Sequence, residues 1–162
     1  MITEIISLCI ASFLVNGCAS QKYKGMIIKK EEEAEFYVKK LENDLGKRAI
    51  KTKSGLQYII TKTGKGKKPK EGQTVYFHYI GKLIDDTIFD SSYNRYRKME
   101  IIIGSGIVIN GWDEGIRKLN VGSKATLIIP PWLGYSQDLL PQLGVNKKKP
   151  YLIYEVEILE II

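Results

Sequence analysis

The sequence predicts an α+β fold in which an antiparallel β-sheet dominates. Segments rich in apolar and β-branched residues, typical of strands, make up most of the chain after residue 50. Glycine-containing turns separate these segments, and only one helical segment is expected among them. Strands that dominate a chain and follow one another through such turns indicate an antiparallel sheet.

The first seventeen residues are typical of an export signal. Residues 5–15 form a largely apolar run, which fits the central part of a signal peptide and is too short to span a bilayer. The run ends at Val15-Asn16-Gly17-Cys18, which resembles a bacterial lipobox. We therefore predict that residues 1–17 are a lipoprotein signal peptide and that lipidated Cys18 anchors the protein to a membrane. Because no Lys or Arg precedes the run, a generic secretory signal and a short membrane-seeking helix are the alternatives.

Cysteine and histidine usage argues against thiol and metal chemistry. Both cysteines, Cys9 and Cys18, lie in the export segment, so no disulfide is expected after export and lipidation. The single histidine, His78, lies between aromatic residues on an expected strand, which favours a structural role over that of a catalytic base. We expect no metal site and no cofactor.

Residues 29–45 show the periodicity of an amphipathic helix. An apolar stripe is formed at helical spacing by Ala34, Val38, Leu41 and Leu45. Residues 31–33 are glutamates expected in the first turn, where carboxylates suit the positive end of the helix dipole, and Gly46 is expected to end the helix. We interpret residues 18–50 as an anchor and a charged spacer helix, with a dimerisation helix as the alternative.

Five strands and one helix are expected in residues 51–162. The helix is expected over Trp112–Leu119, after Asn110-Gly111. Hydrophobic residues make up 44% of the chain, which is typical of a globular domain rather than a disordered one. The expected strands are Gly55–Lys62, Val75–Gly81, Met99–Ile103, Ala125–Ile129 and Tyr151–Ile162.

The basic charge of the chain gathers in two expected loops. The formal net charge is +7, and lysines cluster at residues 62–70 and 147–149. No aromatic residues are interleaved with these lysines, as stacking on single-stranded nucleic acid would require. We therefore interpret both clusters as solvated loops and expect no nucleic-acid partner, with an anionic partner or membrane surface as the alternative.

Three motifs indicate the chemistry of the chain. Residues 75–92 contain an apolar strand, a short turn and then Phe89-Asp90, a carboxylate beside an aromatic ring. Val108-Ile-Asn-Gly-Trp-Asp-Glu-Gly115 and Pro130-Pro-Trp-Leu-Gly-Tyr135 follow in that order. From about residue 53 to residue 162 the chain resembles the FKBP family of peptidyl-prolyl cis-trans isomerases, the macrolide-binding immunophilins. The resemblance implies a twisted antiparallel sheet curled around one short helix, over residues 51–162.

The same resemblance implies a pocket and the roles of its residues. Trp112 would form the floor under a proline ring, the Ile109 N–H would bind a substrate carbonyl, and the Tyr135 hydroxyl would bind the substrate backbone. Asp90, held by Tyr79 and Arg95, would orient that carbonyl electrostatically rather than transfer a proton. The implied catalytic group is Tyr79, Asp90, Trp112 and Tyr135, and the implied substrate-binding residues are Phe89, Met99, Val108, Ile109 and Tyr154.

The chain departs from the family pattern around this pocket. Met99 stands where an aromatic residue is common, and Tyr154 stands where phenylalanine is common. Ser136 replaces a glycine after the pocket tyrosine, and residues 143–150 replace an Ile-Pro-Pro element that caps the pocket. That loop governs substrate choice in the family, so neither substrate preference nor macrolide affinity carries over to this chain.

These features favour an exported, lipid-anchored prolyl isomerase in the bacterial cell envelope, facing the periplasm or the cell surface. Residues 52–58, Thr-Lys-Ser-Gly-Leu-Gln-Tyr, resemble exported bacterial members of the family, including gliding-motility-associated lipoproteins. The expected partners are proline-containing envelope proteins during folding, with a macrolide-type inhibitor as a candidate ligand. Two alternatives stay open: a module that grips proline segments without turnover, and a basic surface-binding lipoprotein with a vestigial pocket.

Overall fold

The computed structural model of the chain describes residues 21–148 and 150–162. Cys18 and the export segment lie outside the described residues, so the signal peptide and the lipid anchor stay predictions. Residues 33–162 form one compact unit, and residues 21–32, the described part of a second unit, are the first half of helix α2 (Gln21–Leu45). Within the described residues, no helix is both long and apolar enough to cross a membrane.

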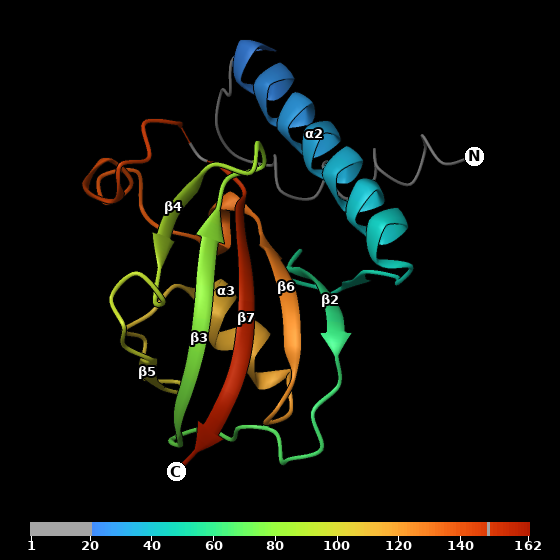
Figure 1. Ribbon diagram of the computed structural model, residues 1–162. Helices are drawn as coiled ribbons and strands as arrows, with labels where there is room; N and C mark the ends of the chain where they lie inside the picture. The colour runs from blue at the N-terminus through green and yellow to red at the C-terminus, as the bar shows by residue number, and fades with distance from the viewer. Residues whose placement is uncertain (1–20, 149) are drawn as a thin grey trace. The chain divides into compact units, whose positions relative to one another are not determined.

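A seven-stranded antiparallel sheet forms the centre of residues 33–162 (Figure 1). The strands follow the order β1-β2-β6-β7-β3-β4, and β5 pairs with β3 as well. Strands β4 and β5 share one edge of β3, with β4 beside residues 80–82 and β5 beside residues 74–77. The strands are β1 (Ile50–Lys51), β2 (Gln57–Lys62), β3 (Thr74–Lys82), β4 (Ile88–Ser91), β5 (Met99–Ile102), β6 (Lys124–Ile129) and β7 (Leu152–Ile161).

The α+β class with an antiparallel sheet is confirmed. All five strands expected from the sequence are present, each within two residues of its expected bounds. The sequence does not predict the two-residue β1 or the four-residue β4. Helix α3 (Asn110–Arg117) begins and ends two residues before the helix expected over Trp112–Leu119.

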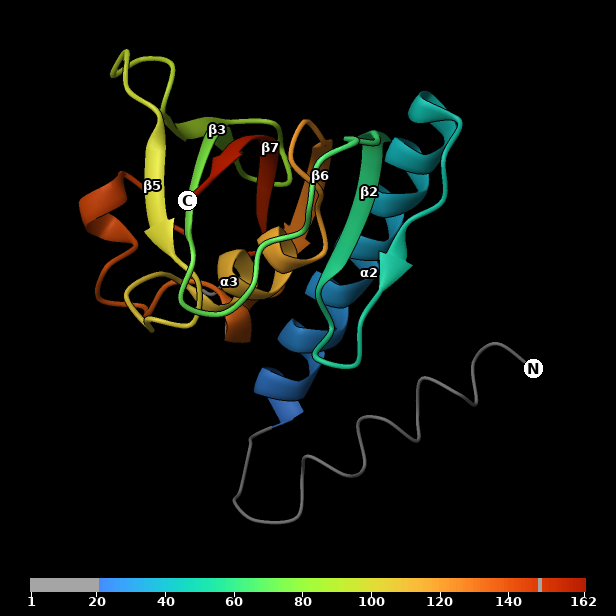
Figure 2. The ribbon, with the colours of Figure 1, turned by 90° about the horizontal axis from the view of Figure 1, so that it is seen from below.

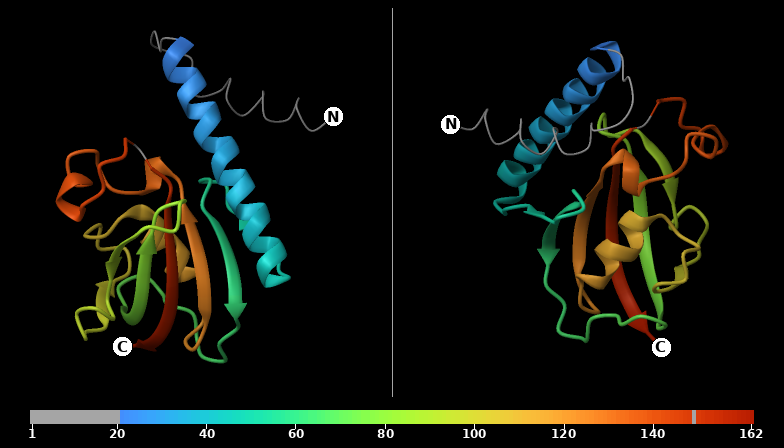
Figure 3. Two further views of the ribbon diagram at one scale, coloured as in Figure 1. Left: turned by 45° about the horizontal axis from the view of Figure 1, so that its top comes forward. Right: turned by 180° about the vertical axis from the view of Figure 1, so that it is seen from behind.

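Helix α3 packs inside the curve of the sheet (Figures 2 and 3). Its approach to β6 is close because two of its residues are glycines. A Cβ at Gly111 would lie 2.4 Å from Ile129 Cγ2, and a Cβ at Gly115 would lie 2.8 Å from Leu127 Cδ1. Alternate β3 residues face the same core, which sets Tyr79 on the helix side of the sheet.

The second half of α2 packs on the outer face of the sheet. Tyr37 and Val38 are buried against Ile128 of β6 and Ile153 of β7 in a small second core. Residues 34–41, which lie within the predicted spacer helix, are therefore part of the compact unit. The docked stripe agrees with the predicted helical periodicity.

The predicted start of this helix is wrong. Helix α2 begins at Gln21 rather than at Lys29, so the glutamates at 31–33 do not lie in its first turn and cannot act on its dipole there. Residues 21–28 include Gln, Lys and Met, which favour a helix by propensity without forming an apolar stripe. The predicted stop is confirmed, because the helix ends at Leu45 and Gly46 has φ of 59°, in the left-handed region that glycine adopts easily.

Candidate functional site

A hollow of about 460 Å³ opens between the start of α3, the β4–β5 edge of β3 and the segment after β6. Its size falls within the range of sites that bind small molecules, and its wall is largely apolar. Seven of the nine side chains implied by the sequence line it, which brings together residues from five separate segments. Its lining is Tyr79, Asp90, Arg95, Met99, Ile107, Val108, Ile109, Trp112, Gly134, Tyr135, Ser136, Leu139 and Leu143.

Trp112 forms the base of the hollow. The chain enters α3 at Ile109, and the N–H groups of Trp112 and Asp113 both donate to the Ile109 carbonyl, which fixes the indole at the first turn. The indole is 3% exposed and meets Tyr79 and Tyr154 edge to face, with ring centroids 4.9 Å away in both cases. Its buried Nε1–H has no hydrogen-bond partner among the described residues. The aromatic packing holds a rigid apolar surface under the opening.

The backbone beside Trp112 leaves one donor free. Ile109 precedes the helix with extended angles, φ of −59° and ψ of 142°. Its N–H donates to no acceptor in the described part of the chain. A free N–H at the wall of an apolar hollow is a natural donor for a ligand carbonyl.

Asp90 lies on one wall and is fully held by protein groups. The Tyr79 hydroxyl donates to Asp90 Oδ2 at 2.6 Å, and the Ser91 N–H donates to Asp90 Oδ1 at 2.8 Å. Arg95 Nη2 lies 3.0 Å from Asp90 Oδ1 and also donates to the Tyr79 hydroxyl. Burial, and then the hydrogen bond to Asp90, raise the pKa of Tyr79 well above its usual value. The wall therefore presents a fixed negative charge braced by a neutral phenol and a guanidinium.

Tyr135 supplies the opposite polar group. It follows the short helix η1 (Pro131–Leu133) and is half-buried. The Tyr154 hydroxyl donates to the Tyr135 hydroxyl at 3.4 Å, which leaves the proton of Tyr135 available for a ligand. Burial raises the pKa of Tyr135, so this hydroxyl is a neutral donor.

Two implied residues, Phe89 and Tyr154, lie behind the lining instead of in it. Tyr154 is completely buried, and the Phe89 ring meets it edge to face at 5.8 Å. They pack behind the residues that line the wall and support it. Ile107 and Leu139 also line the hollow, although the sequence singled out neither. Ser136 and Leu143 line it too, and both belong to the segment whose departure from the family pattern the sequence had shown.

His78 lies on the other face of the sheet. Its Nδ1 is 3.0 Å from the Ser92 Oγ, and its ring stacks on Tyr93 with centroids 4.5 Å apart. It has no place in the hollow, so a structural role fits its position. Among residues 21–148 and 150–162, no three His, Cys, Asp or Glu side chains are grouped as a metal site would require.

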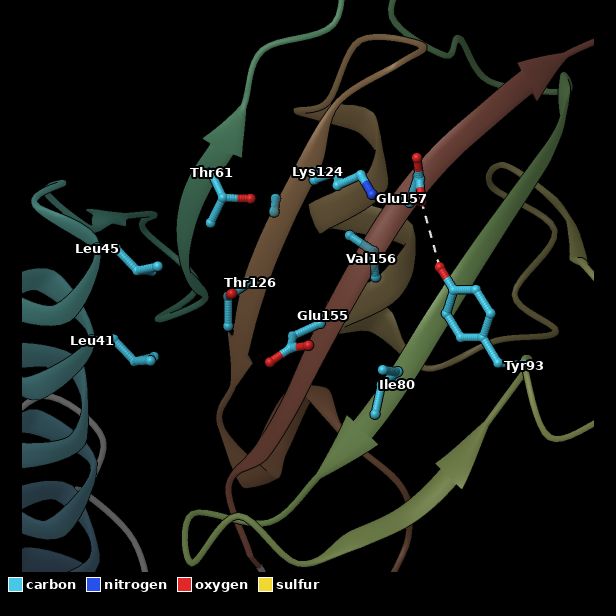
Figure 4. Close-up of a pocket in the computed structure, with 11 residues that line it drawn as sticks. Leu41, Leu45, Thr61, Ile80, Tyr93, Lys124, Thr126, Glu155, Val156 and Glu157 are labelled. Carbon is cyan, nitrogen blue, oxygen red and sulfur yellow. Dashed lines mark hydrogen bonds and ion pairs between the residues drawn. The ribbon is translucent and has the colours of Figure 1, made fainter.

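A second hollow, of about 280 Å³, lies on the outer face between α2 and strands β3, β6 and β7 (Figure 4). Leu41 and Leu45 point into it from the helix. The carboxylates on its sheet side are paired: Glu155 with Lys82 at 2.5 Å, and Glu157 with Lys124 at 3.0 Å. The described lining of this second hollow includes no counterpart of the buried Trp112 floor or of the free Ile109 N–H, so the first hollow is the candidate active site.

Comparisons with known proteins agree with this geometry. A family model described as FKBP-type peptidyl-prolyl cis-trans isomerase matches residues 65–159. The chain is 34% identical over 148 residues to the FKBP-type peptidyl-prolyl cis-trans isomerase FkpA of Escherichia coli K12, covering 91% of this chain and 52% of that protein. FkpA of Buchnera aphidicola subsp. Schizaphis graminum is 38% identical over 130 residues, covering 80% of this chain and 49% of that protein. The chain thus spans about half the length of these bacterial relatives.

Shorter relatives and solved structures match the same region. Peptidyl-prolyl cis-trans isomerase Fkbp12 of Drosophila melanogaster is 42% identical over 108 residues, covering 66% of this chain and 98% of that protein. The crystal structure of Escherichia coli FkpA superimposes with a TM-score of 0.66 at 26% identity, covering 99% of this chain and 82% of that one. That of AtFKBP13 gives a TM-score of 0.63 at 32% identity, covering 71% and 99%. This chain belongs to the FKBP-type peptidyl-prolyl cis-trans isomerase family.

Proposed function

We propose that this protein catalyses cis–trans isomerisation of prolyl peptide bonds in the hollow above Trp112. The observation that carries the proposal is the combination of a rigid indole floor, a free Ile109 N–H and a fixed Asp90 charge in one apolar site. Membership of the isomerase family adds independent support. Nothing in this chemistry calls for a nucleophile, a metal or a cofactor.

The reaction is limited by the resonance of the amide. Rotation about the peptide C–N bond crosses a barrier of about 18–20 kcal/mol, because the planar amide must lose its partial double bond. At the top of the barrier the C–N bond is twisted and the nitrogen is more amine-like. A site that excludes water and fits the twisted bond better than the planar one lowers this barrier.

The residues of the hollow suit those requirements. Trp112 would hold the proline ring by apolar contact, and the Ile109 N–H would bind a flanking carbonyl and orient the substrate. Tyr135 would hydrogen-bond the substrate backbone, while Asp90 would bias the carbonyl through its field. Phe89 and Tyr154 would keep Tyr79 and Trp112 in place from behind.

We also infer that the protein works in the bacterial cell envelope, on proteins that are still folding. Support comes from the apolar run at residues 5–15, the lipobox-like Cys18 and the similarity to bacterial FkpA proteins. Mass spectrometry of the mature protein should find an acyl chain on Cys18 and no residues 1–17. An unmodified chain that keeps those residues would rule out the anchor. Macrolides are candidate ligands of the hollow, since the family is one of macrolide-binding proteins.

A binding module on the same fold is the second candidate. It is favoured by Met99, which gives the hollow a flexible wall, and by the altered segment after Tyr135. Refolding of a protein whose slow phase is limited by prolyl isomerisation separates the two. An isomerase accelerates that phase at sub-stoichiometric concentration, and Trp112→Ala abolishes the acceleration. A binding module has an effect only at a stoichiometry of about one molecule per client molecule, and it slows refolding or leaves the refolding rate unchanged.

A further inference from the structure

The turn between β3 and β4 is held by segments that lie far from it in the sequence. The turn is closed by the Leu83 N–H, which donates to the Thr87 carbonyl at 2.9 Å, and by the Asp86 N–H, which donates to the Leu83 carbonyl at 2.9 Å. Asp86 has φ of 63°, in the left-handed region that glycine adopts more easily than aspartate. Aspartate is one of the few non-glycine residues that adopt this conformation readily, so Asp86 suits the turn.

The Asp86 carboxylate binds helix α2. The buried Tyr37 hydroxyl donates to Asp86 Oδ1 at 2.9 Å, and Lys40 Nζ lies 3.9 Å from Asp86 Oδ2. Burial, and then the hydrogen bond to Asp86, raise the pKa of Tyr37, so its proton stays on the phenol. Because Tyr37 is packed against Ile128 and Ile153, its position is fixed by the sheet and not by the turn.

The neighbouring Asp85 carboxylate binds a different segment. Lys147 donates to Asp85 Oδ2, and the Thr87 N–H donates to Asp85 Oδ1 at 3.2 Å. These bonds, the one from Lys147 first, lower the pKa of Asp85 to about 2. Lys147 belongs to residues 136–148, the segment whose earlier side chains Ser136, Leu139 and Leu143 line the active-site hollow. We call residues 136–148 the pocket loop.

The turn is also joined to the pocket wall. Strand β4 begins at Ile88 and carries Asp90, whose register partner on β3 is Gly81. In Figure 1 the β3–β4 turn lies between α2 and the pocket loop, the red-orange segment after β6. Two adjacent carboxylates therefore connect the docked half of α2, the pocket loop and the strand that holds Asp90.

We propose that helix α2 positions the pocket loop through this turn and so sets which residue is preferred beside proline. Tyr37, Asp86, Asp85 and Lys147 are the positioning residues of the connection. Both ends of the Asp85–Lys147 pair are about half exposed. Exposed pairs add little to overall stability, so removing this pair should leave the fold intact. The inference rests on the proposed isomerase function.

The test uses the full chain and four variants. Tyr37→Phe removes the hydroxyl and keeps the ring. Lys147→Ala removes the ion pair between the turn and the pocket loop. Asp86→Gly removes the acceptor of the Tyr37 hydroxyl, and glycine readily adopts the positive φ of this position. Tyr58→Phe is the matched control, because Tyr58 is a buried tyrosine whose hydroxyl forms no hydrogen bond with another described residue.

Hydrogen exchange gives the readout that does not depend on activity. The Val145 N–H donates to the Leu140 carbonyl at 2.9 Å inside the pocket loop, and Val145 is buried. We expect exchange across residues 139–147 to accelerate by about threefold or more in the three positioning variants, within the range of couplings carried through packed segments. The Tyr58→Phe control should match wild type. Exchange that is unchanged in Tyr37→Phe and Lys147→Ala overturns the proposal.

Selectivity gives the second readout. The ratio of kcat/KM between a Leu-Pro and a Glu-Pro peptide should shift by about threefold in Tyr37→Phe and Lys147→Ala. The conservative variant Lys147→Arg, which keeps a donor for Asp85, should keep the wild-type ratio. If the ratio is unchanged, or if the variants lose only stability, then α2 has a structural role and does not set selectivity. If the wild-type chain has no isomerase activity, the proposed function fails, and the exchange measurement alone decides whether α2 and the loop are coupled.

Discussion

The Asp90 carboxylate accepts hydrogen bonds from Tyr79, Arg95 and the Ser91 N–H, so its charge is fixed before any substrate arrives. A carboxylate committed to three donors is a poor general base, because taking up a proton would break those bonds. Its field can still favour one orientation of a substrate dipole. At the scale of single residues, the proposed catalysis therefore relies on orientation and on exclusion of water.

Asp90→Asn should therefore have a small effect. General acid–base catalysis typically contributes about 10²–10⁴-fold, whereas we expect kcat/KM to fall by less than about tenfold, since the amide keeps an acceptor for Tyr79. The measurement is kcat/KM of wild type and variant on one X-Pro peptide across neutral pH, where both profiles should be flat. A loss of about a hundredfold or more, with a new pH dependence, would show that Asp90 moves a proton.

Tyr79 and Tyr154 should make the fold sensitive to alkali. Burial raises the pKa of both phenols, and the bond to Asp90 raises that of Tyr79 further. Below about pH 10 both phenols are neutral in the folded and in the unfolded chain, so their full contribution to the free energy of unfolding is present. As the pH rises above that value the unfolded chain ionises first, so the free energy of unfolding falls.

Urea unfolding between about pH 8 and about pH 11 measures this fall. We expect the urea midpoint of Tyr79→Phe to fall less steeply with pH than that of wild type. Tyr96→Phe is the control, because Tyr96 is 98% exposed and its removal should leave the slope unchanged. Identical slopes for all three proteins would contradict the assignment of Tyr79 as a buried neutral phenol.

At the scale of elements, the close contact of α3 with β6 sets the depth of the hollow. Gly111 and Gly115 let the helix approach Ile129 and Leu127, and the same helix carries Trp112 into the floor. A larger residue at either glycine would push the helix away from the sheet. The position of the indole therefore depends on two residues that never touch a substrate.

Gly115→Ala tests that dependence. Alanine gains about 1 kcal/mol of helix propensity over glycine, but overpacking a core typically costs about 1–3 kcal/mol. With a Cβ 2.8 Å from Leu127 Cδ1, we expect a net loss of stability in urea unfolding. Gly25→Ala in α2 is the matched control, since beyond its own stretch of helix no atom of the described residues lies within 4 Å of its added Cβ, and it should cause no loss. Equal stability of both variants would contradict the close-packing argument.

Elements with a repeating pattern could be predicted from the sequence, whereas contacts between residues far apart in the chain could not. Strands such as β3 and β7 alternate over many residues, so their positions could be predicted, and the motif around Trp112 located the floor of the hollow. Strand β4 pairs with β3 over only a few residues, and its local sequence contains no period to detect. The docking of α2 depends on Tyr37 meeting Asp86, forty-nine residues away, which no local pattern encodes.

At the scale of the whole molecule, the compact unit combines an isomerase-family domain with half of a helix. The sheet is covered on one face by α3 and on part of the other by residues 34–41 of α2. The candidate active site lies on the α3 side, and the paired carboxylates of the second hollow lie on the α2 side. The two faces meet at the β3–β4 turn, where the helix and the pocket loop are both held.

Prolyl exchange in a short X-Pro peptide tests the central claim most directly. Uncatalysed exchange takes about 10–100 s, so NMR exchange peaks between the cis and trans forms are absent without a catalyst. We predict that catalytic amounts of the full chain produce these peaks, and that Trp112→Ala and Tyr135→Phe weaken them. Peptide signals that shift on binding while the exchange rate stays at its uncatalysed value would contradict the account and leave a proline-binding module.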